Sequence, residues 1–221
     1  MKTKLEARLG AAWITMDDGK VNAMSVDLLE EIAARLDEAE AAAVTVLSGR
    51  PGVFSAGFDL NVFKQGPVAS AEMVTAGVKL ILKLLGHPRP VLALCTGHAY
   101  PMGAFLLLCA DVRIGVAGDA RIGLNEPAIG IDIPQFAVEL ARWRLAPFAS
   151  SRLQTAKMLA PERAREAGYL DEVVAPSELL SAALSEVERL AALDRASFAA
   201  SKARIVQPAL DAIAAAFPAA A

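Results

Sequence analysis

The stretch PVLALCTGHAYPMGAFLLLCAD, residues 90–111, contains a complete strand, loop and helix. Residues 90–95 are apolar at nearly every position, which predicts a strand buried on both faces, because a half-exposed strand alternates apolar and polar side chains. The glycine-containing residues 96–103 predict a loop, and residues 104–111 predict a short buried helix. A buried strand that leads into a helix is the repeating unit of α/β folds with parallel strands.

The same pattern recurs on both sides of this stretch. A second apolar strand is predicted over residues 43–49, followed by a loop over 50–67 and a helix over about 70–86. The remaining predicted elements are strands at 11–16 and within 112–124, helices at 26–42 (capped by Ser25) and 177–193, and mostly helical structure from Phe136 onward. We therefore expect an α/β fold whose sheet is largely parallel.

The composition fits one sizeable core and excludes several classes of partner. Of the 221 residues 55% are hydrophobic, the formal net charge is −3, and the mean hydropathy is +0.40. Lys and Arg are scattered, so no basic face for nucleic acid is expected. The first 16 residues lack the apolar segment of a signal peptide, and the longest apolar run, 104–110, is too short to span a bilayer. We expect a soluble, cytoplasmic protein with no membrane partner.

The cysteines and histidines show no pattern of metal ligation. Cys95 and Cys109 lie inside apolar runs, which predicts reduced, buried thiols. The two histidines are far from a ligand spacing, so we expect no metal. No phosphate-binding glycine motif follows a predicted strand, so no nucleotide cofactor is expected either.

Two loops that follow buried strands share one construction. Gly57 precedes Phe58 in SAGFDL, and Gly103 follows Met102 in HAYPMGAF. The first N–H groups of a helix lack intrahelical acceptors and lie at the positive end of the helix dipole, so the N–H of Met102 or its neighbour can hold a developing negative charge. Glycine next to such a donor lets a ligand approach the backbone. Each loop taken alone also fits ordinary turn chemistry.

One carboxylate, Glu126, occupies an apolar setting in ARIGLNEPAIGIDIP, residues 120–134. We expect its apolar neighbours to be largely buried: Ile122, Leu124, Ala128, Ile129, Ile131 and Ile133. Because glutamate is rarely buried without a partner, two interpretations stay open. Glu126 is either a reactive base in an apolar pocket, or a structural residue that lies on the surface or pairs with an arginine such as Arg113 or Arg121.

Five segments of the chain resemble the crotonase (enoyl-CoA hydratase/isomerase) superfamily in their order and spacing. The resemblance implies a crotonase fold, a spiral of ββα units over residues 1–174, with a helical C-terminal segment over 175–221 used in trimer assembly. It also implies an acyl-CoA thioester as the partner, with CoA as part of the substrate rather than a cofactor. By position, the two backbone N–H donors that polarise the thioester are Phe58 and Met102. The segments are WITMDDGKVNAMS, GRPGVFSAGFDLNVF, PVLALCTGHAYPMGAFLLLCADVRIG, IGLNEPAIGIDIP and PERAREAGYLDEVV.

The carboxylates depart from the pattern of the family's hydratases, which carry two glutamates that hold and activate a water. Here the first of these positions is Phe105 and the second is Glu126. The sequence IGLNE followed by AIGI is similar to that of mitochondrial-type Δ3,Δ2-enoyl-CoA isomerases, where one glutamate shuttles one proton. The chain also resembles actinobacterial-type proteins named enoyl-CoA hydratases. One base suffices to move a double bond from the β,γ to the α,β position, whereas Phe105 accepts no hydrogen bond from a water. We therefore expect Δ3→Δ2 enoyl-CoA isomerisation in fatty-acid metabolism.

Other polar residues nearby have two interpretations each. Asp132 either reaches the same pocket or forms a local turn, and Asn125 either orients Glu126 or caps a turn. His98 and Tyr100 either line the acyl pocket or make core hydrogen bonds.

Two further classes of function stay open beside the isomerase. The first is another crotonase reaction, such as hydration or thioester hydrolysis, with Asp132 assisting. The second is an acyl-CoA-binding protein without catalysis, which the phenylalanine at position 105 keeps open. The apolar face of helix 177–193 predicts a homo-oligomer, a trimer or a hexamer.

Overall fold

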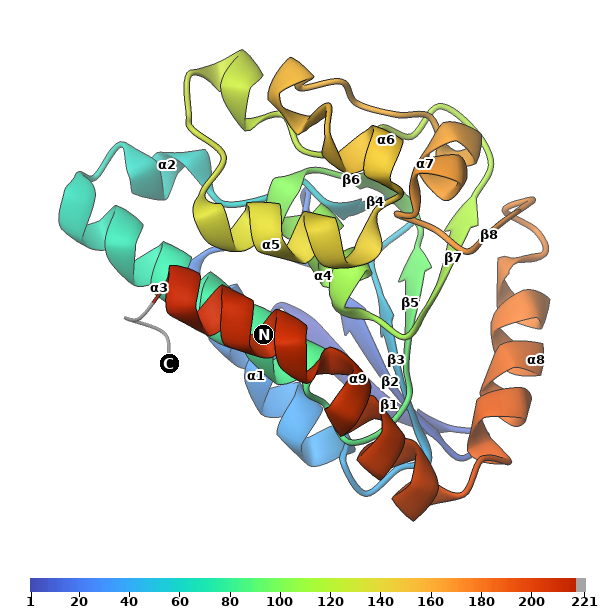
Figure 1. The fold of residues 1–221 in the computed structure, drawn as a ribbon. Coiled ribbons are helices and arrows are strands. Elements are labelled where there is room, and N and C mark those ends of the chain that lie inside the picture. The colour runs from blue at the N-terminus through green and yellow to red at the C-terminus, as the bar shows by residue number, and fades with distance from the viewer. Residues whose placement is uncertain (218–221) are drawn as a thin grey trace.

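A computed structural model describes residues 1–217, which form a large sheet, a small sheet and the helices that cover them (Figure 1). The large sheet has the strand order β1-β2-β3-β5-β7-β8. All neighbouring strands are parallel except β1 and β2, which are antiparallel. Its strands are β1 (Thr3–Arg8), β2 (Ala11–Met16), β3 (Val44–Ser48), β5 (Val91–Cys95), β7 (Val112–Val116) and β8 (Glu172–Val174).

The small sheet pairs β4 (Gly52–Ser55) with β6 (Gly97–Ala99) in parallel. Single bridges extend it from Ala99 to Ile122 and from Ile122 to Leu159. A Cβ atom on Gly97 would lie 2.0 Å from the carbonyl group of Gly52, so β6 approaches β4 this closely only with glycine there.

Helices cover both faces of the large sheet. The main core lies between the sheet and α1, α3, α4, α5 and α9, whereas α8 alone covers the other face, where Val187 and Leu190 pack near Trp13 and Val46. The helices are α1 (Val26–Ala39), α2 (Leu60–Phe63), α3 (Pro67–Leu85), α4 (Pro101–Cys109), α5 (Gln135–Arg144), α6 (Pro147–Ser150), α7 (Pro161–Ala167), α8 (Leu179–Ala191) and α9 (Arg195–Ala216), with 3₁₀ turns at Glu126–Ile129 and Leu153–Thr155.

This order confirms the predicted α/β fold and the spiral of ββα units. The chain forms a strand of the large sheet, a strand of the small sheet and then a helix, first as β3, β4 and α3 and again as β5, β6 and α4. In the next turn, the single bridge at Ile122 takes the place of the small-sheet strand.

The predicted elements differ from the observed ones mainly where elements are short. The loops predicted over 50–67 and 96–103 contain β4 and β6, and β1 was not predicted. Of the two short strands predicted within 112–124, the first is β7, which ends at Val116, and the second is reduced to single bridges at Ile122. Helix α4 begins at Pro101, three residues before the predicted start, because proline is well suited to the first turn of a helix.

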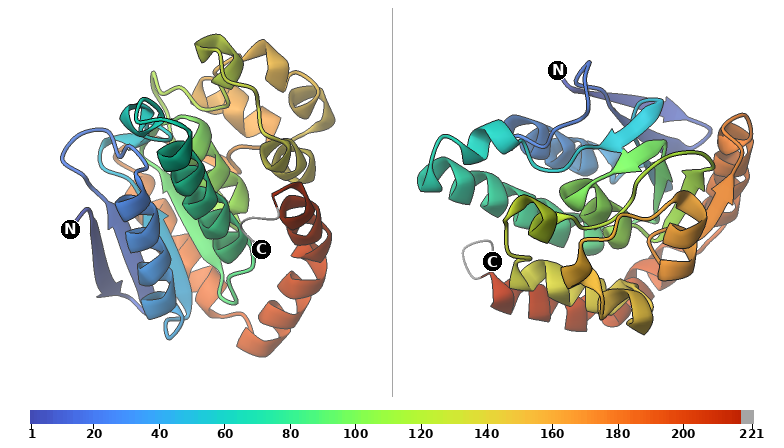
Figure 2. Two further views of the ribbon diagram at one scale, coloured as in Figure 1. Left: turned by 90° about the vertical axis from the view of Figure 1, so that its left-hand side faces the viewer. Right: turned by 90° about the horizontal axis from the view of Figure 1, so that it is seen from above.

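The C-terminal helices pack on the rest of the chain rather than apart from it. Helix α9 lies along α5 and α3 (Figure 2), and Lys202 of α9 donates to Asp111 at 2.7 Å while only 6% exposed. The boundary between 174 and 175 stays a prediction, and residues 218–221 of the predicted segment lie outside the described residues.

Both cysteines are free and buried, and burial raises their thiol pKa to about 12, as expected for core thiols. Among residues 1–217, none of the helices has the length and apolarity needed to cross a membrane.

Candidate functional site

A cavity of about 390 Å³ lies where the loops after β4 and β6 meet the turn at Glu126–Ile129. Most of its wall is apolar and comes from four separate segments of the chain. The apolar side chains include Leu60, Phe63, Val74, Ile129, Ile131 and Phe136. The polar side chains on the wall are those of Tyr100, Asn125, Glu126 and Asp132. We call this space the reaction cavity.

The backbone of Phe58 on the wall of the reaction cavity presents a free donor. Met24 donates to the carbonyl of Gly57 at 2.8 Å, and Asp59 donates to the carbonyl of Met24 at 3.1 Å. Because successive residues of an extended backbone direct their polar groups to opposite sides, the N–H of Phe58 points away from Met24. It has no acceptor among residues 1–217.

Met102 supplies a second free donor at the start of α4. The helix begins with Pro101, and its first hydrogen bond runs from Ala104 N–H to Tyr100 O at 2.9 Å. The N–H of Met102 precedes that bond and has no acceptor in the described chain. The helix dipole adds partial positive charge at this position.

The two donor loops lie side by side. A Cβ atom on Gly57 would be 3.4 Å from the nitrogen of Pro101, and Tyr100 donates to the carbonyl of Ser55 at 2.9 Å. Gly57 has φ +87°, a conformation that favours glycine. A Cβ on Gly103, by contrast, would lie 2.8 Å from Cβ of Ser55. Gly103 therefore allows α4 to pack on β4 and does not face the reaction cavity.

Glu126 begins the 3₁₀ turn on the wall of the reaction cavity and is 6% exposed. Its Oε2 is buried and has no hydrogen-bond partner among the described residues. Burial in these apolar surroundings raises the pKa of the carboxyl group above its ordinary value. A carboxylate in this state is a stronger base than one in water.

The structural alternative for Glu126 is wrong. Arg113 pairs with Asp171, with Nε 2.9 Å from Oδ2, and no ion pair within residues 1–217 includes Glu126. The expectation that the neighbours of Glu126 are buried holds for Ile122 and Leu124 only. Ala128 and Ile129 are exposed, and Ile131 and Ile133 are partly exposed, because the chain turns here to form the edge of the cavity.

Of the other predicted residues, some are on the wall of the reaction cavity and others are not. Asn125 and the exposed Asp132 are on its wall. Phe105 is fully buried behind the wall and packs edge-on against Phe136, with ring centroids 5.8 Å apart. His98 is not on the wall; its Nδ1 accepts a hydrogen bond from the N–H of Arg121 at 3.0 Å.

Sequence analysis did not single out Tyr169, which is 3% exposed and follows α7. Burial and the negative charge of Glu126 both raise the pKa of its hydroxyl group, so the phenol is neutral. No motif around Tyr169 indicates this proximity, since α5, α6 and α7 separate it from Glu126 along the chain.

The reaction cavity has the unpaired N–H of Phe58 and one buried carboxylate on the same wall, and the unpaired N–H of Met102 comes directly after Pro101 of that wall. Such donors stabilise negative charge on an oxygen, and the carboxylate can accept a proton from a neighbouring carbon. Within the described chain, no three His, Cys, Asp or Glu side chains are grouped to hold a metal ion.

The comparisons with known proteins agree with this fold. The enoyl-CoA hydratase/isomerase family model matches residues 6–220, and the chain belongs to this family, which places it in the crotonase superfamily of fatty-acid metabolism. A crystal structure of an enoyl-CoA hydratase/isomerase family protein from Pseudomonas syringae is 40% identical, with a TM-score of 0.95 over 97% of this chain and 94% of that one. The apo structure of an enoyl-CoA isomerase from Mycobacterium tuberculosis is 37% identical, with a TM-score of 0.92 over 97% of this chain and 95% of that one.

Among curated proteins, the human mitochondrial enoyl-CoA delta isomerase 1 is 30% identical over 196 residues, which are 85% of this chain. The matched region spans 65% of the length of that relative. The chain is therefore a member of the enoyl-CoA hydratase/isomerase family over nearly its whole length.

Proposed function

We propose that the chain is a Δ3,Δ2-enoyl-CoA isomerase in which Glu126 is the only base. The observation that carries this proposal is the state of Glu126, a buried carboxylate on the cavity wall whose Oε2 has no partner. The other carboxylate on the wall, Asp132, is exposed to solvent. The similarity to proteins described as enoyl-CoA isomerases supports the same reaction.

The proposed reaction moves one proton and one double bond. Glu126 removes a proton from the α-carbon of a β,γ-unsaturated thioester, and the electron pair moves onto the thioester oxygen to form a dienolate. The N–H groups of Phe58 and Met102 hold that oxygen, and a preorganised donor of this kind contributes about 3 kcal/mol. The dienolate then takes the same proton back from Glu126 at the γ-carbon, which leaves the double bond in the α,β position.

Hydration requires the site to activate a water as well as to move a proton, and the reaction cavity suits this less well than it suits isomerisation. A water must be held and deprotonated while the α-carbon receives a proton, which two carboxylates accomplish more readily than one. Phe105 presents no acceptor, and its ring packs on Phe136. Hydration with the help of Asp132 is the second candidate function, because Asp132 lies on the same wall as Glu126.

The apolar wall suits the acyl chain of the substrate. Leu60, Phe63 and Val74 lie on the part of the wall that α2 and α3 supply. The CoA part then supplies binding energy far from the reacting carbons, which orients the thioester between the donors and the base. We therefore expect a short N-acetylcysteamine thioester to lose rate as well as affinity.

We also infer that the chain forms a homo-oligomer. Within residues 175–217 three large apolar side chains are exposed: Leu180 (44%), Leu193 (40%) and Ile205 (61%). Contact with another copy would remove this apolar surface from water. Light scattering coupled to size exclusion distinguishes a monomer from a trimer or a hexamer.

The test of the proposed reaction uses the purified protein with 3-enoyl-CoA and 2-enoyl-CoA of the same chain lengths. Formation of 2-enoyl-CoA and of 3-hydroxyacyl-CoA is followed in parallel. We expect isomerisation to be much faster than addition of water at every length. Efficient hydration of 2-enoyl-CoA that is lost in Asp132→Asn would favour the second candidate and overturn the isomerase proposal.

A further inference from the structure

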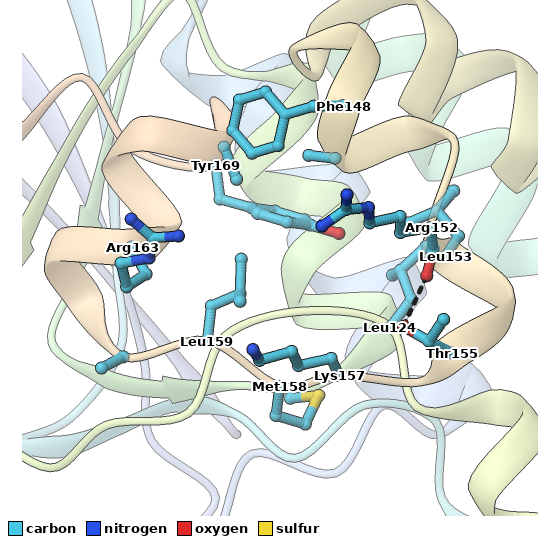
Figure 3. A pocket seen from close by; sticks show the side chains of 13 residues that line it. Leu124, Phe148, Arg152, Leu153, Thr155, Lys157, Met158, Leu159, Arg163 and Tyr169 are labelled. Atoms are coloured by element: carbon cyan, nitrogen blue, oxygen red, sulfur yellow. Dashed lines mark hydrogen bonds between the residues drawn. The ribbon is translucent and has the colours of Figure 1, made fainter.

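A second cavity, of about 180 Å³, lies between α6, α7 and the segment that joins them (Figure 3). None of the residues on its wall is on the wall of the reaction cavity. We call it the basic cavity, because Arg152, Lys157 and Arg163 lie on its wall and no carboxylate does.

Two of these cations have no counter-charge among residues 1–217. Arg163 pairs with Glu166 on the same helix. Arg152 and Lys157 form no ion pair within the part of the chain that the structure describes. Figure 3 shows Arg152 and Arg163 at opposite ends of the cavity, with Lys157 along its lower side. The uncompensated positive charge therefore comes from Arg152 at one end and from Lys157 along the side.

Apart from its cations, the wall of the basic cavity is largely apolar and carries the hydroxyl groups of Thr155 and Tyr169, of which Thr155 donates to the carbonyl of Arg152. Leu153, Met158 and Leu159 contribute aliphatic surface, and Phe148, which is 50% exposed, lies at the edge. Tyr169 is 3% exposed, and its hydroxyl group makes no hydrogen bond within residues 1–217. Its hydroxyl end points toward Arg152 in Figure 3. Because Tyr169 is on the cavity wall, its hydroxyl group can donate to an acceptor on a ligand.

The size of the basic cavity limits what it can hold. Its volume corresponds to about six water molecules in the liquid, whereas cavities for drug-sized ligands begin at roughly 300 Å³. A whole acyl-CoA is excluded. A bare inorganic ion fits the charge but leaves the apolar floor facing water.

We propose that the basic cavity binds a small anion that carries a short apolar body, with a carboxylate or a phosphate monoester as its head group. The head group meets Arg152, Lys157 and the hydroxyl of Tyr169, and the apolar body lies on Leu153, Met158 and Leu159. Guanidinium groups bind carboxylates and phosphates with paired hydrogen bonds, so the two head groups share one recognition chemistry. This site is separate from the reaction cavity, and its existence does not depend on which reaction the enzyme performs.

The test locates the ligand with methionine methyl groups. Met158 lies on the wall of the basic cavity, whereas Met102 is fully buried in α4 and lies on the wall of neither cavity. The full-length protein is labelled with ¹³C-methyl methionine and titrated with hexanoate, hexyl phosphate, hexanol and inorganic phosphate, each alone. We expect saturable shifts of the Met158 signal with hexanoate or hexyl phosphate, the tighter of which identifies the head group. Hexanol and inorganic phosphate should bind at least about tenfold more weakly.

Substitutions then separate the charges from the apolar floor. Replacing Arg152→Gln together with Lys157→Gln should raise the Kd of hexanoate at Met158 at least about tenfold, the worth of one charge-assisted hydrogen bond. Arg165→Gln is the matched control, because Arg165 lies on α7 beside Arg163 and is absent from the cavity wall. All three replaced side chains are exposed, so circular dichroism should show an unchanged fold.

Three results would overturn the proposal. The first is saturable binding of hexanoate without a shift of Met158, which places the anion outside the basic cavity. The second is equal binding of hexanol and hexanoate, which removes the role of the charge. The third is an unchanged Kd in the doubly substituted protein.

Discussion

Replacing Glu126→Gln should remove activity while leaving the protein at least as stable. The substitution keeps the shape of the side chain and its capacity for hydrogen bonds, but the amide cannot accept a proton. Glu126 is 6% exposed and its Oε2 has no partner, so no ion pair or hydrogen bond to Oε2 within the described residues is lost.

The expected loss of rate follows from the number of bases on the wall. A positioned general base contributes a factor of about 10² to 10⁴. At 1.36 kcal/mol for each factor of ten, this is about 2.7–5.4 kcal/mol in the activation free energy. Asp132, the other acid on the wall, is exposed and is not expected to replace Glu126. Affinity for the thioester should change little, because the proton transfer occurs only in the transition state.

The stability of this variant should change in the opposite direction to its activity. Burial raises the pKa of Glu126 in the folded protein, so the folded state holds this proton more tightly than the unfolded chain does. Ionised Glu126 therefore lowers the free energy of unfolding as pH rises from the unfolded pKa toward the folded one. Glutamine carries no charge, so the variant gains stability relative to wild type at about pH 8 and not at about pH 4.

The assay measures kcat and KM for 3-enoyl-CoA together with thermal melting at both pH values. Glu162→Gln is the control, because Glu162 is an exposed carboxylate on α7 outside both cavities. A loss of rate below about tenfold would refute the role of Glu126 as the only base. A variant less stable than wild type at the higher pH would refute the account of its burial.

Three more predictions follow from the same structure. The rate of isomerisation should fall as pH drops through the raised pKa of Glu126, since the protonated acid accepts no proton; a pH profile with its acid limb at the ordinary value of 4.5 would contradict this. Gly57→Ala should lower kcat/KM while the protein stays folded, because φ is +87° at this position of the donor loop. Gly103→Val should mainly lower the melting temperature, because its Cβ meets β4, and the reverse pattern would show that these roles are misassigned. Lys202→Met should leave Asp111 without its charged partner and lower the free energy of unfolding by about 3 kcal/mol, which is a fall of about 6–12 °C in Tm for a chain of this size. A shift under about 2 °C would exclude a structural role for the pair.

Much of the fold could be predicted from the sequence because its longer elements carry strong patterns. The runs at 43–49 and 90–95 are apolar throughout, and only a strand buried on both faces accounts for them at that length. The strands β4 and β6 could not be predicted, since each has four residues or fewer and the runs contain glycine. Their existence depends on pairing between segments that are far apart in the chain.

The candidate site divides in the same way. The sequence alone determined that Glu126 is a carboxylate in a mainly apolar segment, that position 105 has no acid, and that glycine-containing loops follow two buried strands. Only the tertiary structure decided that Met24 turns the N–H of Phe58 outward, and that Gly103 serves packing instead of ligand approach. The physical reason is that residue type is local, whereas the direction of an N–H, the desolvation of a carboxylate and the nearness of Tyr169 to Glu126 arise only when separate ββα units pack together.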